Sequence, residues 1–159
     1  MKRLLPGVLA AACIFALGGC SSLPRDAADS YNQAAGGALR VGVSPHAPWT
    51  VVDSLTGEVS GTEADLVREF AEEMGADVDF RIAPESVLAE MMSNYDLDVV
   101  IGGLSHDTGW DDKMAFTRPY ETVTGADGKD DKKVMAVGLG ENRMLVELER
   151  FLSKKTGEI

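Results

Sequence analysis

The segment Gly102-Gly103-Leu104-Ser105 has the residue types of a small-molecule site. Two glycines let a ligand approach backbone N–H groups closely, and the Ser105 hydroxyl can both donate and accept a hydrogen bond. The segment follows directly on the apolar run from Leu97 to Ile101, so a plain exit from a strand explains it equally well. Gly103 and Ser105 are therefore candidate ligand-binding residues, and both interpretations stay open.

Other polar and aromatic residues lie in segments that could join them. Trp49 can supply an aromatic wall next to His46, although a half-buried tryptophan and an exposed histidine are the simpler explanation. Thr62 and Glu63 begin a helical pattern. The helix dipole favours a carboxylate at that position in any protein, so Glu63 is either a capping charge or part of the same cleft.

We find no catalytic or metal-binding set in the sequence. A nucleophile needs a base within reach and an orienting partner, but the chain has two histidines and neither a G-x-S-x-G nor an H-E-x-x-H motif. Asp107, Asp111 and Asp112 lack the spacing and the terminal glutamate of a calcium loop. We therefore expect a protein that is not an enzyme and that holds no cofactor and no metal.

Alternating strands and helices must position the candidate residues. Short β-rich runs bounded by turn residues predict strands, and apolar residues at steps of three and four predict helices. Strands are expected at residues 39–43, 49–52, 78–81, 97–101 and 134–137, and helices at residues 62–74, from residue 84, and around residues 144–152. This order predicts an α/β fold with a mostly parallel sheet of about five strands flanked by helices.

The candidate residues are expected at one end of this sheet. Sites in such sheets lie beyond the carboxyl ends of the strands. Three loops should meet there, at residues 44–48, 61–63 and 102–110. The sequence thus predicts a single cleft that these loops line.

The first nineteen residues have the layout of a signal peptide. Lys2 and Arg3 precede an uncharged apolar stretch at residues 4–17, which is shorter than the about 20 residues that cross a membrane. Leu17-Gly18-Gly19-Cys20 resembles the lipobox of bacterial lipoproteins, which implies a diacylglyceryl group on Cys20 and cleavage before it. An ordinary cleaved signal with an incidental cysteine is the alternative. Two acyl chains attach a protein stably, so we expect a lipoprotein on the extracytoplasmic face of the cell membrane.

The composition agrees with one exported domain on a tether. Only two cysteines exist and Cys13 lies in the signal peptide, so the exported domain has no disulfide. The net charge of −11 disfavours nucleic acid as a partner. Residues 20–38 are small and polar without apolar periodicity, which indicates a flexible tether. Residues 39–159 have a length that suits a single domain.

Four motifs, in order over residues 39–120, resemble the family 3 extracellular solute-binding proteins, the amino-acid-type receptors of ABC importers. They are Leu39-Arg40-Val41-Gly42-Val43, Gly61-Thr62-Glu63-Ala64-Asp65-Leu66, Leu97-Asp98-Val99-Val100-Ile101-Gly102-Gly103-Leu104-Ser105 and Phe116-Thr117-Arg118-Pro119-Tyr120. The resemblance implies a lobe of the periplasmic-binding-protein type, a small polar solute such as an amino acid, and an ABC permease as a further partner.

The second lobe of that family is expected to be missing. Family members build it after the fourth motif and return to lobe 1 through a strand and a helix. Here a polar linker at residues 121–133 takes its place, and residues 134–159 resemble the return segment. One open face leaves a small ligand largely in water, so we expect weak binding. The alternative is a ligand-less accessory or scaffold lipoprotein that presents its open face to a protein partner.

Two further positions depart from the family pattern. Trp110 stands where the amino-acid binders have an arginine for the carboxylate of the ligand, and an indole has one donor where a guanidinium has five. Tyr95 replaces a frequent glycine, so Asn94 is expected to take the left-handed conformation that ends the helix. The complete set of candidate cleft residues is Trp49, Thr62, Glu63, Gly103, Ser105 and Trp110.

Overall fold

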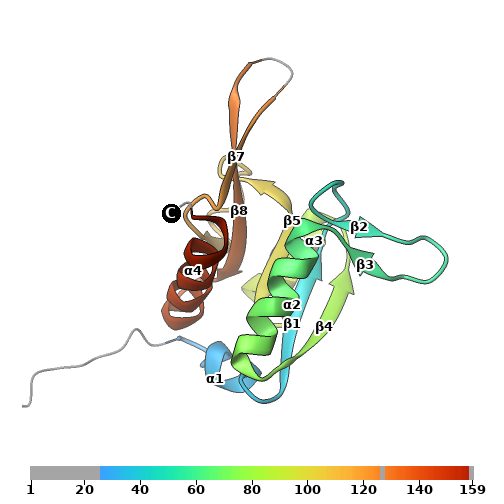
Figure 1. Ribbon diagram of the computed structural model, residues 1–159. Coiled ribbons are helices and arrows are strands. Elements are labelled where there is room, and N and C mark those ends of the chain that lie inside the picture. The colour runs from blue at the N-terminus through green and yellow to red at the C-terminus, as the bar shows by residue number, and fades with distance from the viewer. Residues whose placement is uncertain (1–25, 126–127, 158–159) are drawn as a thin grey trace, which may run out of the picture.

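The computed structural model describes residues 26–125 and 128–157 (Figure 1). Cys20 and the predicted signal peptide lie outside the described residues. The helices are α1 (Ser30–Ala34), α2 (Thr62–Met74), α3 (Glu85–Ser93) and α4 (Asn142–Thr156). The strands are β1 (Ala38–Val43), β2 (Val51–Val52), β3 (Val59–Ser60), β4 (Asp77–Ile82), β5 (Val99–Ser105), β6 (Met114–Phe116), β7 (Glu121–Thr124) and β8 (Asp130–Gly138). No helix among the described residues has the length and apolarity needed to cross a membrane.

The main sheet has the strand order β4-β1-β5-β8-β6, with β7 also paired to β8. β1 is parallel to β4 and to β5, as expected, but β8 is antiparallel to β5, β6 and β7. The predicted α/β fold is therefore confirmed, whereas the expectation of a mostly parallel sheet is wrong for this second half. β6 and β7 have three and four residues, which is too short to show a period of two in the sequence.

Helices cover both faces of the sheet. Alternate residues of each central strand face opposite sides, so Met135 and Val137 pack with α2 and α4, while Val134 and Ala136 pack with α3. Figure 1 shows α2 and α4 on the same side of the sheet. α2 covers the residues predicted for it and ends at Gly75, whose φ of 67° is the expected left-handed cap.

The predicted linker at residues 121–133 has a different form. Its described residues, 121–125 and 128–133, belong to the hairpin of β7 and β8, whose register pairs Glu121 with Lys133 and Thr124 with Asp130. In Figure 1 this hairpin projects at the top of the molecule. Threonine and valine in β7 suit a strand, but the charged residues that begin β8 hide the strand in the sequence.

The residues 26–38 also differ from the expected tether. They contain α1, and Asp26 accepts hydrogen bonds from the backbone N–H groups of Arg143 and Met144 at the start of α4. Glu141 is buried and accepts from the N–H groups of Ala28 and Ser30 in return. These hydrogen bonds hold the segment, which contributes Ala34 and part of Tyr31 to the core. Two apolar residues are too few for hydrophobic periodicity to reveal the segment.

An ion pair joins the first and third motifs. Asp98 is buried and accepts hydrogen bonds from the backbone N–H, Nε and Nη2 of Arg40, the last at 2.6 Å. The expectation for Asn94 is wrong: its φ is −90°, and Tyr95 takes the left-handed conformation with a φ of 58°. The Tyr95 hydroxyl donates to the Leu139 carbonyl and the Tyr95 carbonyl accepts from Arg40, so both ends of the residue are anchored.

Candidate functional site

The carboxyl ends of β1 and β5 lie side by side and carry the predicted Gly-Gly-Leu-Ser segment. This segment is the last part of β5 and not the loop that was expected. The turn after β1 closes through backbone hydrogen bonds between His46 and Thr50, which bring Trp49 onto Gly103. A Cβ atom on Gly103 would lie 2.8 Å from the Trp49 ring, and the φ of Gly103 is +60°. Both facts require glycine at this position.

Glu63 lies beneath the two glycines with no exposed surface. Its Oε2 accepts the N–H groups of Gly102 and Gly103 at 2.8 and 2.9 Å, and its Oε1 accepts the Tyr120 hydroxyl at 2.6 Å. Burial raises the pKa of Glu63, and the hydrogen bonds from Tyr120 and the two amides oppose that rise. The Glu63 carboxyl group therefore already accepts the hydrogen bonds of the two backbone N–H groups that we expected to bind a ligand.

Lys133 brings a buried ammonium group to the outer side of the same segment. The Lys133 side chain is 2% exposed. Its Nζ lies 4.2 Å from the centre of the Trp49 ring and donates to the Gly103 carbonyl at 2.9 Å and to the Ser105 hydroxyl at 3.5 Å. It also pairs with Asp131 Oδ2 at 2.7 Å. We call Trp49, Gly103, Ser105, Asp131 and Lys133 the strand-end cluster.

Neighbouring groups hold the strand-end cluster in place. Trp49 Nε1 donates to Glu121 Oε2 at 2.9 Å, and the His46 ring meets the indole edge-on with a centroid separation of 5.3 Å. Hydrogen bonds from Lys133 and from Ser105 lower the pKa of Asp131, which keeps this carboxylate charged to more acidic pH. The cluster is thus an ordered set of ionic and aromatic groups.

A hollow of about 230 Å³ opens next to the strand-end cluster. Carboxylates outnumber cations on its walls, which favours a solute with a positive group. The residues that line it are Ser105, His106, Asp107, Asp130, Asp131 and Lys132.

The six candidate residues are not all brought together. Trp49, Gly103 and Ser105 meet in the strand-end cluster, and Glu63 lies below it. Thr62 is exposed and lines a separate hollow of about 270 Å³ with Leu66, Tyr120, Glu121 and Thr156. Trp110 packs against the α3 side of the sheet and donates from Nε1 to Glu85 at 3.3 Å.

Sequence reasoning missed Lys133 and Asp131, which it assigned to the linker. A signal for them was present. Extending the strand of residues 134–137 backwards with a period of two places both residues on the side of Met135 and Val137. They were passed over because charged residues are seldom buried.

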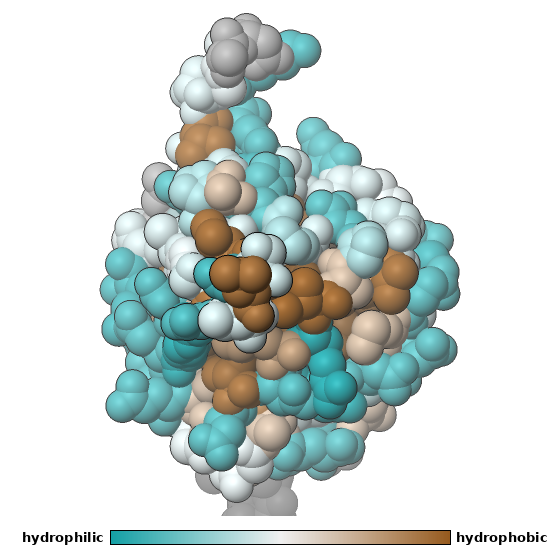
Figure 2. Space-filling model, turned by 90° about the vertical axis from the view of Figure 1, so that its right-hand side faces the viewer, coloured by the Kyte–Doolittle hydropathy of each residue, from teal (hydrophilic) through white to brown (hydrophobic). Residues whose placement is uncertain are grey.

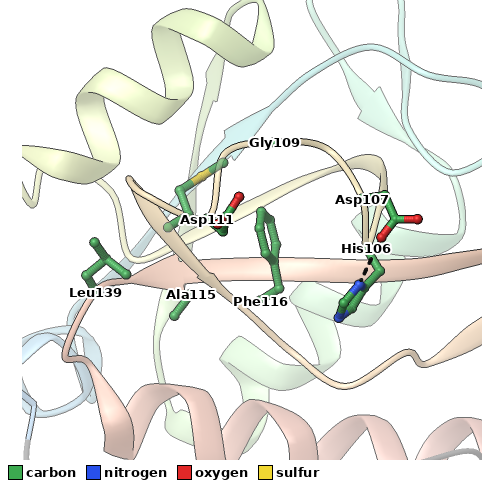
Figure 3. Close-up of a pocket in the computed structure, with 8 residues that line it drawn as sticks. His106, Asp107, Gly109, Asp111, Ala115, Phe116 and Leu139 are labelled. Atoms are coloured by element: carbon green, nitrogen blue, oxygen red, sulfur yellow. Dashed lines mark hydrogen bonds and ion pairs between the residues drawn. The ribbon is translucent and has the colours of Figure 1, made fainter.

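A further hollow, of about 630 Å³, lies beside the edge strand β6 and contains none of the candidate residues. In Figure 3, the Phe116 ring points toward the loop that carries Gly109 and Asp111, and His106 Nδ1 lies 3.3 Å from Asp107. Its polar groups are exposed on a shallow surface. In the described part of the chain, no group of three histidine, cysteine or acidic side chains could hold a metal ion.

A comparison with known protein families shows to which family the chain belongs. The sequence model of the bacterial extracellular solute-binding proteins, family 3, matches residues 39–154. The chain belongs to this family. Family 3 proteins work outside the cytoplasm, so the predicted resemblance and the extracytoplasmic setting are confirmed.

The names of similar proteins refer to amino acids. A "Probable histidine-binding protein" of Neisseria gonorrhoeae is 29% identical over 125 residues, which are 78% of this chain and 46% of the relative. This chain thus spans less than half the length of that relative. The arginine-bound domain 1 of TmArgBP has a TM-score of 0.65 and 25% identity, covering 74% of this chain and 93% of that chain. An ancestral cationic amino acid solute-binding protein has a TM-score of 0.66 and 15% identity, covering 82% and 94%.

Proposed function

We propose that this family 3 protein is a membrane-tethered lobe that binds a small polar solute of the amino-acid class at the strand-end cluster. The observation that carries the proposal is the hollow beside Ser105, whose walls offer hydroxyl, imidazole and carboxylate groups from the carboxyl end of β5 and the first residues of β8. The names of the relatives, which refer to histidine, arginine and cationic amino acids, support the same solute class. Because those names describe binding proteins, we propose that this chain also binds its solute without catalysis.

Binding is proposed to be weak. Ligand pockets commonly enclose about 300 to 1,000 Å³ and bury most of the ligand, whereas the hollow beside Ser105 measures only about 230 Å³. The strongest donors at the strand ends, the N–H groups of Gly102 and Gly103, are already paired with Glu63. A solute would therefore use the outer groups, chiefly Ser105, Asp131 and the Trp49 ring.

The tether is proposed to consist of a signal peptide at residues 1–19, removed on export, and a diacylglyceryl group on Cys20. Asp26 is already fixed to the start of α4, and six residues of chain span at most about 20 Å. α1 lies at the opposite end of the molecule from the β7–β8 hairpin (Figure 1). A lipid on Cys20 would thus hold the α1 end near the membrane, with an ABC permease as the proposed partner.

One set of observations favours the second candidate, a ligand-less accessory lipoprotein. Figure 2 shows apolar side chains gathered among polar ones on the face that carries β2, β3 and β4. The exposed apolar residues of this region are Val51, Leu55, Ile82 and Val87, and Leu55 is 94% exposed. Exposed apolar groups of this kind mark protein contacts when they form a continuous patch.

A thermal-unfolding titration of the chain from Ser21 to Ile159 tests the proposed function. The solutes are arginine, histidine, glutamate and a small organic acid, each at millimolar concentration. A solute at one hundred times its Kd stabilises the fold by about 2.7 kcal/mol, so weak binding is measurable. We expect a saturable rise in Tm with arginine or histidine. Ser105→Ala should abolish it, and Ser54→Ala, an exposed serine between β2 and β3 that is not part of the cluster, should leave it unchanged. A folded chain that responds to none of the solutes would favour the accessory role.

A further inference from the structure

The surroundings of Lys133 Nζ are those of a complete ammonium site. An aromatic face, a carbonyl oxygen, a hydroxyl oxygen and a carboxylate all lie within contact distance of this one nitrogen. A primary ammonium has three donors and no acceptor, and it is attracted to the face of a tryptophan. Each of the four groups around Lys133 Nζ can therefore interact favourably with a cation. Together they come from three separate segments of the chain.

Packing alone does not explain why position 133 is a lysine. Met135 and Val137, which share the same face of β8, are ordinary core residues. A buried ammonium group is unfavourable unless it is paired and hydrogen-bonded. An apolar side chain at position 133 would cover the Trp49 ring without that requirement. The charge of Lys133 thus matches the cluster rather than the core.

We propose that Trp49, Gly103, Ser105 and Asp131 form a binding site for a primary ammonium group, that Lys133 of the same chain fills it, and that an external cation enters by displacing Lys133. The inference rests on the proposed function, since it gives the chemical class of the solute and the regulation of binding at the same site. Asp131 is the route of entry, because its side chain is 37% exposed and also lines the hollow beside Ser105.

Internal competition explains why binding should be weak. A group tethered to the same chain acts at an effective concentration of about millimolar or more, so an external ammonium must exceed that value to compete. Removing the Lys133 side chain should open the site without removing any of its walls. The walls belong to other residues, three of which, Trp49, Gly103 and Ser105, lie outside β8.

The test is chemical rescue of Lys133→Ala. This substitution removes three carbons and the ammonium nitrogen, which are the atoms of n-propylammonium. We expect n-propylammonium at millimolar concentration to raise the Tm of Lys133→Ala by at least about 3 °C, while n-propanol, of the same size without charge, raises it much less. The unsubstituted chain should respond much less, because Lys133 competes for the site, and Lys154→Ala, an exposed lysine on α4 outside the site, should respond like the unsubstituted chain. No response of Lys133→Ala, or an equal response to the alcohol, would overturn the proposal.

A second measurement covers the case in which Lys133→Ala does not fold. Acetylation of the unsubstituted chain, followed by peptide mass spectrometry, should modify Lys133 at least about tenfold more slowly than Lys132. Methylguanidinium, which carries no competing amine, should raise the rate at Lys133 only. Equal rates at the two lysines, or no effect of methylguanidinium, would refute displacement.

The two proposals can fail separately. If the unsubstituted chain binds no amino acid but Lys133→Ala is rescued by n-propylammonium, the ammonium site stands and the proposed function fails. If amino acids bind while Lys133→Ala shows no rescue, the reverse holds.

Discussion

Glu63 is expected to be the residue on which the strand ends depend most. Glu63→Ala leaves the N–H groups of Gly102 and Gly103 and the hydroxyl of Tyr120 without their acceptor. Each buried donor left unpaired costs about 1 to 3 kcal/mol. Three such donors give an expected loss of roughly 3 to 9 kcal/mol, a large share of the about 5 to 15 kcal/mol that stabilises a typical domain.

Urea unfolding followed by circular dichroism at pH 7 measures this loss. Glu63→Gln keeps the shape and one acceptor, so its expected loss is smaller, about 1 to 3 kcal/mol. Asp65→Ala is the matched control on the same helix, because its carboxylate is 70% exposed and pairs only with a surface arginine. If Glu63→Ala costs no more than Asp65→Ala, the role assigned to Glu63 is refuted.

The pH dependence of stability gives an independent check on Glu63. Burial raises the pKa of Glu63 in the folded protein above its ordinary value of 4.5. The folded state then holds this proton more tightly than the unfolded state. The contribution to stability is complete below pH 4.5 and declines as the pH rises through the folded pKa. Glu63→Gln should remove that decline, as seen by comparing urea midpoints between acid and neutral pH. An unchanged pH profile in Glu63→Gln would contradict the assignment.

Three further predictions concern the frame and the tether. Asp26→Ala should lower the unfolding free energy by about 1 to 2 kcal/mol through loss of the α4 cap, whereas Asp112→Ala on the surface should not change it in the same urea experiment. Asp98→Ala should lower the unfolding free energy by about 3 kcal/mol, because it leaves the Arg40 guanidinium and backbone N–H without their acceptor. The same urea experiment measures this loss, and a loss under about 1 kcal/mol would count against a structural ion pair. Cys20→Ala should move the protein from the membrane to the soluble fraction on cell fractionation, and membrane retention of this variant would exclude the proposed lipid anchor.

The sequence was sufficient where residues repeat in long patterns. The apolar steps of α2 gave that helix in place, because its apolar face packs on the core. The continuous apolar run at residues 97–101 indicated β5, because both faces of this strand are buried. Three of the candidate cleft residues, Trp49, Gly103 and Ser105, also met as predicted from the rule that sites form at the carboxyl ends of parallel strands.

The misses have physical causes. The carboxylates of Asp26 and Glu141 fix the segment before β1 by accepting hydrogen bonds from backbone N–H groups more than a hundred positions away, and no local sequence pattern indicates such a contact. Lys133, the fourth residue of β8, is a buried cation, against the usual preference for an exposed lysine. Thr62 and Trp110 were grouped with the cleft by motif, but their side chains lie at a neighbouring hollow and on the α3 side.

The central claim, a solute site at the strand-end cluster, is tested most directly by the fluorescence of Trp49. The chain has two tryptophans, so Trp110→Phe leaves Trp49 as the only reporter. Titration of this variant with arginine should give a saturable change with a Kd in the millimolar range, and Asp131→Asn in the same background should abolish it. A Trp49 signal that stays flat, or that changes linearly and equally in the Asp131→Asn chain, would contradict the account.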